Sequence, residues 1–233
     1  MTMEVVGSTG AFSVLDKAGA VRERTGASTV EPCDWTALGA AIEGYRRELL
    51  PIAAGRAFRL GDFTLSSGKR STHYVDGKQV TLAHPEAALL FARIILKALE
   101  HQHVNAIGGL TIGADPIVGG VVVLSALEGK PIPGFIVRKE AKKHGLQKDI
   151  EGGTLASGAR AVVIDDVVTT GTSLLDAIGK VEECGAHVVG VLALTDRQEG
   201  GKELLERQGY PVFAVFTAEE LKREKRCQEA LAT

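Results

Sequence analysis

The sequence predicts an α/β fold in which helices flank a central parallel sheet and a small hairpin precedes it. Three observations support this prediction. From about residue 100 onward, short β-rich apolar runs alternate with helical stretches, which is the pattern of strand–helix units in a parallel sheet. Residues 161–164 are continuously apolar, as expected of a strand buried on both faces. Residues 58–76 contain two β-rich runs around a polar turn, which predicts the hairpin.

The segments before the sheet are predicted as helix, hairpin and helix. Apolar residues recur at three- and four-residue steps over 35–54, the spacing of one helix face. The hairpin over 58–76 has its predicted turn at residues 66–69, which are Ser-Ser-Gly-Lys. Residues 85–100 form a second amphipathic pattern and are predicted to be helical.

Five strands and four helices are predicted for the rest of the chain. The strands are expected at 104–109, 133–137, 159–164, 187–194 and 212–216. The helices are expected at 115–127, 174–184, 201–208 and 218–230. Residues 147–158 are polar and glycine-rich, which predicts a long mobile loop, and such loops in compact domains are usually functional.

Length and composition predict one globular domain with an added segment. Of the 233 residues, 45% are hydrophobic and 24% are charged, which is ordinary for a soluble protein. We expect the domain at 35–233, with hood elements over 35–80 and an α/β core over 100–217. Residues 1–34 are rich in small residues and weakly periodic, and are expected to be a poorly ordered or loosely packed extension.

Charge and cysteine content exclude several classes of partner. The net charge of −2 implies no general attraction to nucleic acid or membrane. The longest apolar stretch, 117–127, is far shorter than the roughly 20 residues that span a bilayer. Cys33, Cys184 and Cys227 show neither metal-ligand spacing nor a disulfide framework, which indicates a reducing, cytoplasmic setting. Cys184 is expected to pack in the core near a helix end.

Residues 161–173 carry the most specific motif of the chain. An apolar strand is followed by Asp165 and Asp166, at the end where open α/β sheets bind ligands. Residues 169–173 then offer backbone N–H groups and hydroxyls before a helix, an arrangement that attracts phosphate. Gly171 lets the backbone come close to the ligand. The motif predicts a sugar-phosphate pocket; the alternative is a buried strand, a solvated Asp-Asp turn and a threonine helix cap.

A second cluster is basic and follows the strand predicted at 133–137. It brings five cationic or titratable side chains together: Arg138, Lys139, Lys142, Lys143 and His144. Their charge suits a pyrophosphate leaving group. The alternative is a solvated basic loop.

These motifs together resemble a known family. Residues 161–173 resemble the signature of the type I phosphoribosyltransferases, which bind phosphoribosyl pyrophosphate. Residues 138–145 are similar to the catalytic loop of the orotate phosphoribosyltransferases within that family. Residues 63–76 are similar to their orotate-covering hairpin, and residues 195–199 to their strand-end segment whose arginine meets orotate. The four motifs lie in the family's order, and the resemblance covers the chain from about residue 40 to its C-terminus.

The resemblance implies the fold, the reaction and the assembly. The fold would be the type I phosphoribosyltransferase sheet with a small N-terminal hood. The reaction would transfer the phosphoribosyl group to orotate, giving orotidine 5′-monophosphate and pyrophosphate in de novo UMP synthesis. Mg²⁺ would be held mainly by the substrate, with no direct protein site. The partners would be the two substrates and a second copy of the chain, in a homodimer where Lys142 and His144 reach the neighbouring site.

The resemblance also assigns roles to individual residues. The residues implied in catalysis are Lys142, His144 and Asp166. The residues implied in binding phosphoribosyl pyrophosphate are Arg138, Lys139, Lys142, His144, Asp165, Asp166, Val167, Val168, Thr169, Thr170, Gly171, Thr172 and Ser173. The residues implied in binding orotate are Thr169, Arg197, Tyr74 and Val75, with the hairpin backbone adding specificity.

Two lysines found in some family members are absent from this chain. Ser66 stands in place of one, and the other belongs to a loop that here contains Gly113 and no lysine. Lys69, Arg70 and Lys78 are consequently left without an assigned role. The loop at 108–113 can still bind pyrophosphate through backbone N–H groups, since a nest of amides needs no side chain.

Two alternative functions remain open. One is a phosphoribosyltransferase for another base, which would not be expected to carry the 138–145 loop or the 66–76 hairpin. The other is a non-catalytic regulator that senses phosphoribosyl pyrophosphate. Such a regulator needs a nucleic-acid-binding element, and residues 1–34 show no helix-turn-helix pattern and no basic character. Consumption of phosphoribosyl pyrophosphate, as opposed to binding alone, distinguishes an enzyme from a sensor.

Overall fold

The computed structural model describes residues 13–15, 21–23, 30–64, 70–139, 149–153 and 155–232. The chain divides into two compact units, Met1–Glu31 and Pro32–Thr233. In the first unit, β1 (Ser13–Leu15) pairs antiparallel with β2 (Val21–Glu23). The second unit begins before the expected boundary at residue 35. Cys33 is buried there, and its N–H donates to the carbonyl of Val189 at 2.7 Å.

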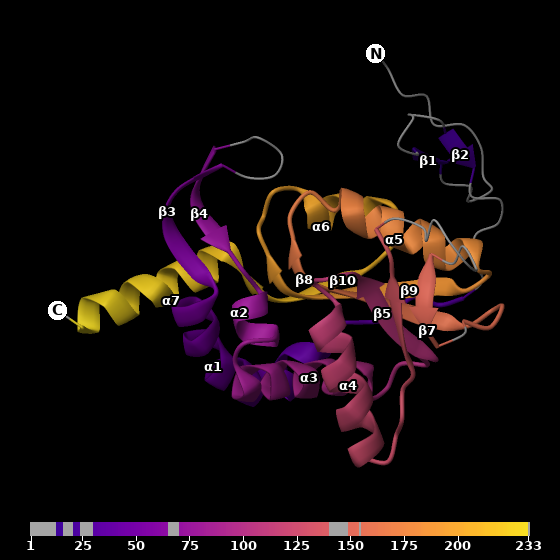
Figure 1. Ribbon diagram of the computed structural model, residues 1–233, viewed down its shortest axis with the longest axis horizontal. Coiled ribbons are helices and arrows are strands. Elements are labelled where there is room, and N and C mark those ends of the chain that lie inside the picture. Colours follow the sequence, from indigo (N-terminus) through magenta and orange to yellow (C-terminus); the bar gives the residue numbers. More distant parts are fainter. Residues whose placement is uncertain are drawn as a thin grey trace. The chain divides into compact units, whose positions relative to one another are not determined.

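A six-stranded sheet forms the centre of the larger unit, with the strand order β10-β9-β8-β5-β6-β7 (Figure 1). The first five of these strands run parallel, and β7 joins the edge antiparallel to β6. The strands are β5 (Ala106–Leu110), β6 (Gly134–Val137), β7 (Ile150–Gly152), β8 (Arg160–Val168), β9 (His187–Asp196) and β10 (Val212–Thr217). The predicted α/β architecture is therefore confirmed.

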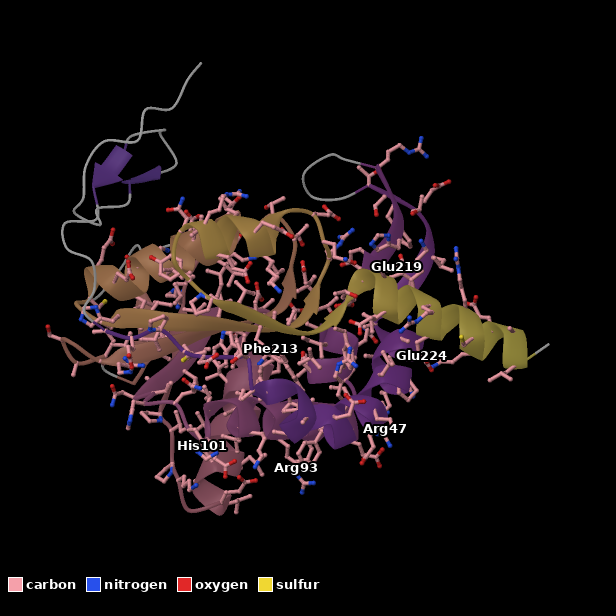
Figure 2. All side chains as sticks on the ribbon, turned by 180° about the vertical axis from the view of Figure 1, so that it is seen from behind. Arg47, Arg93, His101, Phe213, Glu219 and Glu224 are labelled. Carbon is pink, nitrogen blue, oxygen red and sulfur yellow. The ribbon has the colours of Figure 1, made fainter. Side chains whose placement is uncertain are left out.

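Helices cover both faces of this sheet, as Figure 1 shows. One face carries α1 (Leu38–Arg56), α3 (Pro85–Leu99) and α4 (Asp115–Leu127). The other carries α5 (Thr172–Glu183) and α6 (Gly201–Arg207). The last helix, α7 (Ala218–Leu231), packs against α1 and begins at a capping box between Thr217 and Glu220. Figure 2 shows charged side chains at the surface here, Glu219 and Glu224 on α7 and Arg47 on α1.

The predicted hairpin is present as β3 (Phe58–Thr64) and β4 (Arg70–Val75), followed by the one-turn helix α2 (Lys78–Thr81). The two strands pair antiparallel, with a register shift between Leu60 and Phe63. The predicted turn at 66–69 lies outside the described residues.

Three sequence-based expectations were wrong. Strand β8 continues to Val168 rather than ending at Ile164, because β9 pairs with it as far as Val168↔Asp196. Residues 150–152, expected in a loop, form β7 because their backbone completes the open edge of β6. Cys184 is exposed at the end of α5, and Cys33 is the buried cysteine.

No helix in the described ranges is long and apolar enough to cross a membrane. The apolar residues instead pack between the sheet and its helices. Strands β8 and β9 lie at the centre of this core, and Ile164 and Leu192 are among its largest fully buried side chains.

Strand β5 passes too close to its neighbours to carry a side chain at Gly109. A Cβ there would lie 2.0 Å from the carbonyl oxygen of Ile164 and 2.7 Å from Cβ of Ala114. We expect Gly109→Ala to lower the free energy of unfolding by about 3 kcal/mol, because the backbone of β8 must move. Chemical denaturation measures this change.

Gly44→Ala is the matched control, since Gly44 lies in α1 and a Cβ added there would meet nothing within 4 Å. Gly44→Ala is expected to raise the free energy of unfolding by up to about 1 kcal/mol, because glycine is a weaker helix former than alanine. Equal effects of the two substitutions would contradict the close approach of β5 and β8.

Candidate active site

Three loops meet at the carboxyl edge of the sheet, where parallel α/β sheets bind ligands. They follow β5, β8 and β9, which end at Leu110, Val168 and Asp196. Backbone hydrogen bonds join two of these loops: Arg197 N–H donates to Val168 O at 2.9 Å, and Gly201 N–H donates to Thr169 O at 3.0 Å. The sequence motifs at 165–173 and 195–199 are thus brought together.

The two acids of the main motif lie inside β8 and are closely covered by the loop after β5. Asp166 is 7% exposed, and its N–H donates to Asp165 Oδ1 at 2.9 Å. A Cβ on Gly113 would lie 2.5 Å from Asp165 Oδ1 and 2.8 Å from Asp166 Oδ1. The backbone at Gly113 can approach the carboxylates this closely only because glycine lacks a side chain.

The surroundings of Asp165 favour its neutral form. Burial is the main cause, and the adjacent charge of Asp166 adds to it, so the pKa of Asp165 rises to about 8. A hydrogen bond from the backbone N–H of Asp166 acts in the opposite direction. A ligand that donates hydrogen bonds or positive charge to this acid pair would favour the charged form.

The loop after β8 forms a small anion-sized cavity. Its volume is about 100 Å³, and its lining includes Asp165, Thr169, Thr170, Gly171 and Ser173. Helix α5 begins at Thr172, two residues earlier than expected, with Gly171 as its N-cap at φ 79°. Free N–H groups at this helix start suit a phosphate.

The remaining residues of the motif at 165–173 lie partly in the lining of this cavity and partly in the core. Val167 also lines the cavity, and Thr172 is exposed at the first turn of α5. Val168 is fully buried, so its side chain belongs to the core and only its backbone is available to a ligand.

A second cavity, of about 510 Å³, lies beside the first predicted basic residues. Its lining includes Arg138 and Lys139 together with Thr111 and Asp115 from the β5–α4 region. Arg138 pairs with Glu151 on β7 at 3.3 Å. Glu151 was not predicted at the site, because its segment was expected to be a loop. Lys142 and His144 lie outside the described residues.

Arg197 is buried directly after β9 and joins the hairpin to the sheet edge. Its side chain is 5% exposed and pairs with Glu199 at 2.8 Å. The same nitrogen donates to Ser71 Oγ on β4 at 3.3 Å. Gln198 between the two charged residues has φ 60°, which turns the chain back so that Glu199 reaches Arg197.

The hairpin residues proposed to line the base do not share one face. Val75 is buried, whereas Tyr74 is 40% exposed and lies 5.6 Å from the ring of Phe63. This follows from strand geometry, since successive side chains point to opposite faces. His73 stacks on Phe58, and burial with the nearby Arg197 charge lowers the pKa of His73.

Lys78 is a site residue for which the sequence predicted no role. Its Nζ lies 3.1 Å from Asp76 Oδ1 and 3.3 Å from Asp166 Oδ2. A basic residue next to the hairpin was the only signal in the sequence, and the contact joins segments 88 residues apart.

Comparison with known proteins supports the same family. The family described as "Phosphoribosyl transferase domain" matches residues 69–214. The chain is 47% identical over 190 residues to the orotate phosphoribosyltransferase of Nostoc sp., covering 82% of this chain and 90% of the relative. It is 42% identical to that of Aquifex aeolicus, covering 76% and 97%. The Mycobacterium tuberculosis orotate phosphoribosyltransferase in complex with 5-phospho-α-D-ribosyl 1-diphosphate has a TM-score of 0.63 and 33% identity, covering 76% and 99%.

The raised pKa of Asp165 predicts a pH dependence of stability. The folded chain holds the Asp165 proton over the range from the ordinary value of 3.8 to about 8. The unfolded chain releases it, so this group's contribution to stability is lost as the pH rises through that range. In the Asp165→Asn variant we expect the free energy of unfolding to fall less steeply with rising pH, because asparagine does not titrate.

Denaturation at several pH values measures this, with Asp62→Asn on an exposed position of β3 as the control. A pH slope that is the same in Asp165→Asn and in the unmodified chain would show that Asp165 titrates normally.

Proposed function

The chain belongs to the orotate phosphoribosyltransferases, which form orotidine 5′-monophosphate in pyrimidine synthesis, and we propose how its residues divide that reaction. The observation that carries the proposal is the convergence of the acid pair, the phosphate loop and Arg197 at one edge of the sheet. The loop at 169–173 would hold the 5-phosphate of phosphoribosyl pyrophosphate. Asp165 and Asp166 would face the ribose hydroxyls, and Arg197 would meet orotate.

Loss of pyrophosphate is the step that needs most electrostatic help. Displacement at the anomeric carbon passes through an oxocarbenium-like state, as in glycoside chemistry. Negative charge then develops on the leaving group, and preorganised cations stabilise it. Arg138 and Lys139 border the 510 Å³ cavity where this group would lie. We expect Lys142 and His144, which follow them in the sequence, to contribute to the same task.

Mg²⁺ would enter with phosphoribosyl pyrophosphate. The site's acid pair is already engaged, Asp165 with the N–H of Asp166 and Asp166 with Lys78. This fits an ion held mainly by substrate oxygens, because Mg²⁺ in such sites commonly binds one or two carboxylates plus substrate phosphates. Bound Mg²⁺ supplies charge neutralisation on the pyrophosphate.

A homodimer is supported by an exposed apolar face on α4. Val123 is 62% exposed and Leu127 is 79% exposed, and Ile112 in the preceding loop is 59% exposed. Gly119 and Gly120 lie exposed between them, and no charged side chain interrupts the helix after Asp115. Such faces on soluble proteins commonly mark interaction surfaces. A second copy on α4 would lie next to the loop that covers Asp165 and Asp166, as shared active sites require.

The cytoplasm is the compartment we propose. All three cysteines are free thiols, one buried and two exposed. Exposed free thiols suit a reducing compartment.

The decisive experiment follows the ultraviolet absorbance of orotate with Mg²⁺ and phosphoribosyl pyrophosphate, with uracil, hypoxanthine and adenine in parallel. Conversion of orotate alone, and only with both additions, is expected. Arg197→Ala should raise the KM for orotate by about tenfold or more, because a charge-assisted contact with the substrate is lost. Turnover of another base would replace the proposed substrate, and binding without turnover would favour the sensor.

The apolar face gives a separate prediction. The double variant Val123→Glu with Leu127→Glu is expected to be monomeric in sedimentation velocity, because burying two carboxylates at an interface is unfavourable. Leu231→Glu, at an 89% exposed position on α7, is the control and should leave the dimer intact. A dimer that survives both carboxylates on α4 would exclude this face as the interface.

A further inference from the structure

Lys78 is held in place by its backbone as well as by its charge. It begins α2, and the residue before it packs directly on Asp166. A Cβ on Gly77 would lie 2.7 Å from Cβ and 2.9 Å from Oδ2 of Asp166. The chain just before is tied down too, since Asp76 N–H donates to Ala57 O at 3.0 Å. The packed backbone at residues 76–77 therefore places Lys78 next to Asp166.

The ammonium of Lys78 lies between two carboxylates. It is 3.1 Å from Asp76 Oδ1 and 3.3 Å from Asp166 Oδ2. Partial burial works against the charge of Lys78, but Asp166 and Asp76 outweigh it and raise the pKa of the lysine. Burial would likewise raise the pKa of Asp76, yet hydrogen bonds from Lys78 and Gln79 hold it below its ordinary value. The pKa shifts of Lys78 and Asp76 thus both favour the charged forms of these two side chains.

The position of Lys78 matters because the substrate is itself strongly anionic. Asp165 and Asp166 present carboxyl groups where a sugar carrying a phosphate and a pyrophosphate would bind. Among the described residues, Lys78 is the one cation that pairs with either acid. The side chain of Lys78 is 38% exposed, whereas that of Asp166 is 10% exposed, so the lysine is the more accessible member of the pair.

We propose that Lys78 is a positioning residue for phosphoribosyl pyrophosphate, which holds the Asp166 carboxylate toward the ribose hydroxyls and offsets its repulsion of the phosphates. The proposal rests on the proposed function and assigns a specific task to α2. Lys78 acts on the phosphoribosyl donor and not on orotate, whose expected contacts at Arg197 lie on a different strand end.

The test compares neutral and conservative substitutions at Lys78. Lys78→Met keeps most of the length and removes the charge, Lys78→Gln is a second neutral variant, and Lys78→Arg keeps the charge. Lys97→Met is the matched control, because Lys97 is also in an ion pair, with Glu100 on the exposed surface of α3. Calorimetry measures binding of phosphoribosyl pyrophosphate with Mg²⁺ in the absence of orotate, and steady-state kinetics gives both KM values.

We expect the neutral variants to weaken binding of phosphoribosyl pyrophosphate by about tenfold, the typical value of one hydrogen bond to a charged group. The KM for this substrate should rise in parallel, the KM for orotate should change less than about twofold, and Lys78→Arg should recover most of the loss. Lys97→Met should behave as the unmodified chain.

Two results would overturn the proposal. One is unchanged calorimetric affinity in both neutral variants. The other is an equal rise in both KM values with a lowered melting temperature, which would make Lys78 a folding residue only. If the unmodified chain converts no orotate, the proposed function fails. The calorimetric comparison still decides the role of Lys78 in that case.

Discussion

The structure depends on how closely three backbone segments approach the acid pair of β8. Gly113 passes over both carboxylates, Gly77 packs against Asp166, and Gly109 lies against the carbonyl of Ile164 just before them. No side chain could be added at any of these positions without moving a neighbour. Because the sheet, the loop after β5 and the start of α2 all meet there, the same close packing that stabilises the sheet edge also shapes the site.

This packing also determines the surroundings of the two acids. A carboxyl group removed from water favours its neutral form, and Asp165 follows that rule. Asp166 has a cation beside it, Lys78, which comes from a remote part of the chain. Two adjacent residues of the same type therefore have different surroundings. Such division is common in active sites, where neighbouring acids take different tasks.

Much of this arrangement could be predicted from sequence, since most of it is local. The alternation of strands and helices, the glycine- and hydroxyl-rich loop before α5 and the arginine after β9 each lie within a few consecutive residues. What could not be predicted depends on pairing between distant segments. The length of β8 depends on its partner β9, and the strand β7 depends on the free edge of β6. The contact of Lys78 with Asp166 depends on a fold that brings together segments 88 residues apart. Exposure of Cys184 likewise follows from where α5 ends, which periodicity locates only approximately.

The strand pair β6–β7 has a consequence for the segment between them. Arg138 N–H donates to Asp149 O at 2.8 Å, and Lys180 on α5 reaches both Arg138 O, at 2.6 Å, and the carboxylate of Asp149, at 3.1 Å. The two ends of the segment carrying Lys142 and His144 are thus fastened to each other and to the body of the protein. Closing a chain into a loop costs conformational entropy. Here the contacts at Arg138 and Asp149 form as part of the folded domain, so this part of the entropy cost belongs to folding.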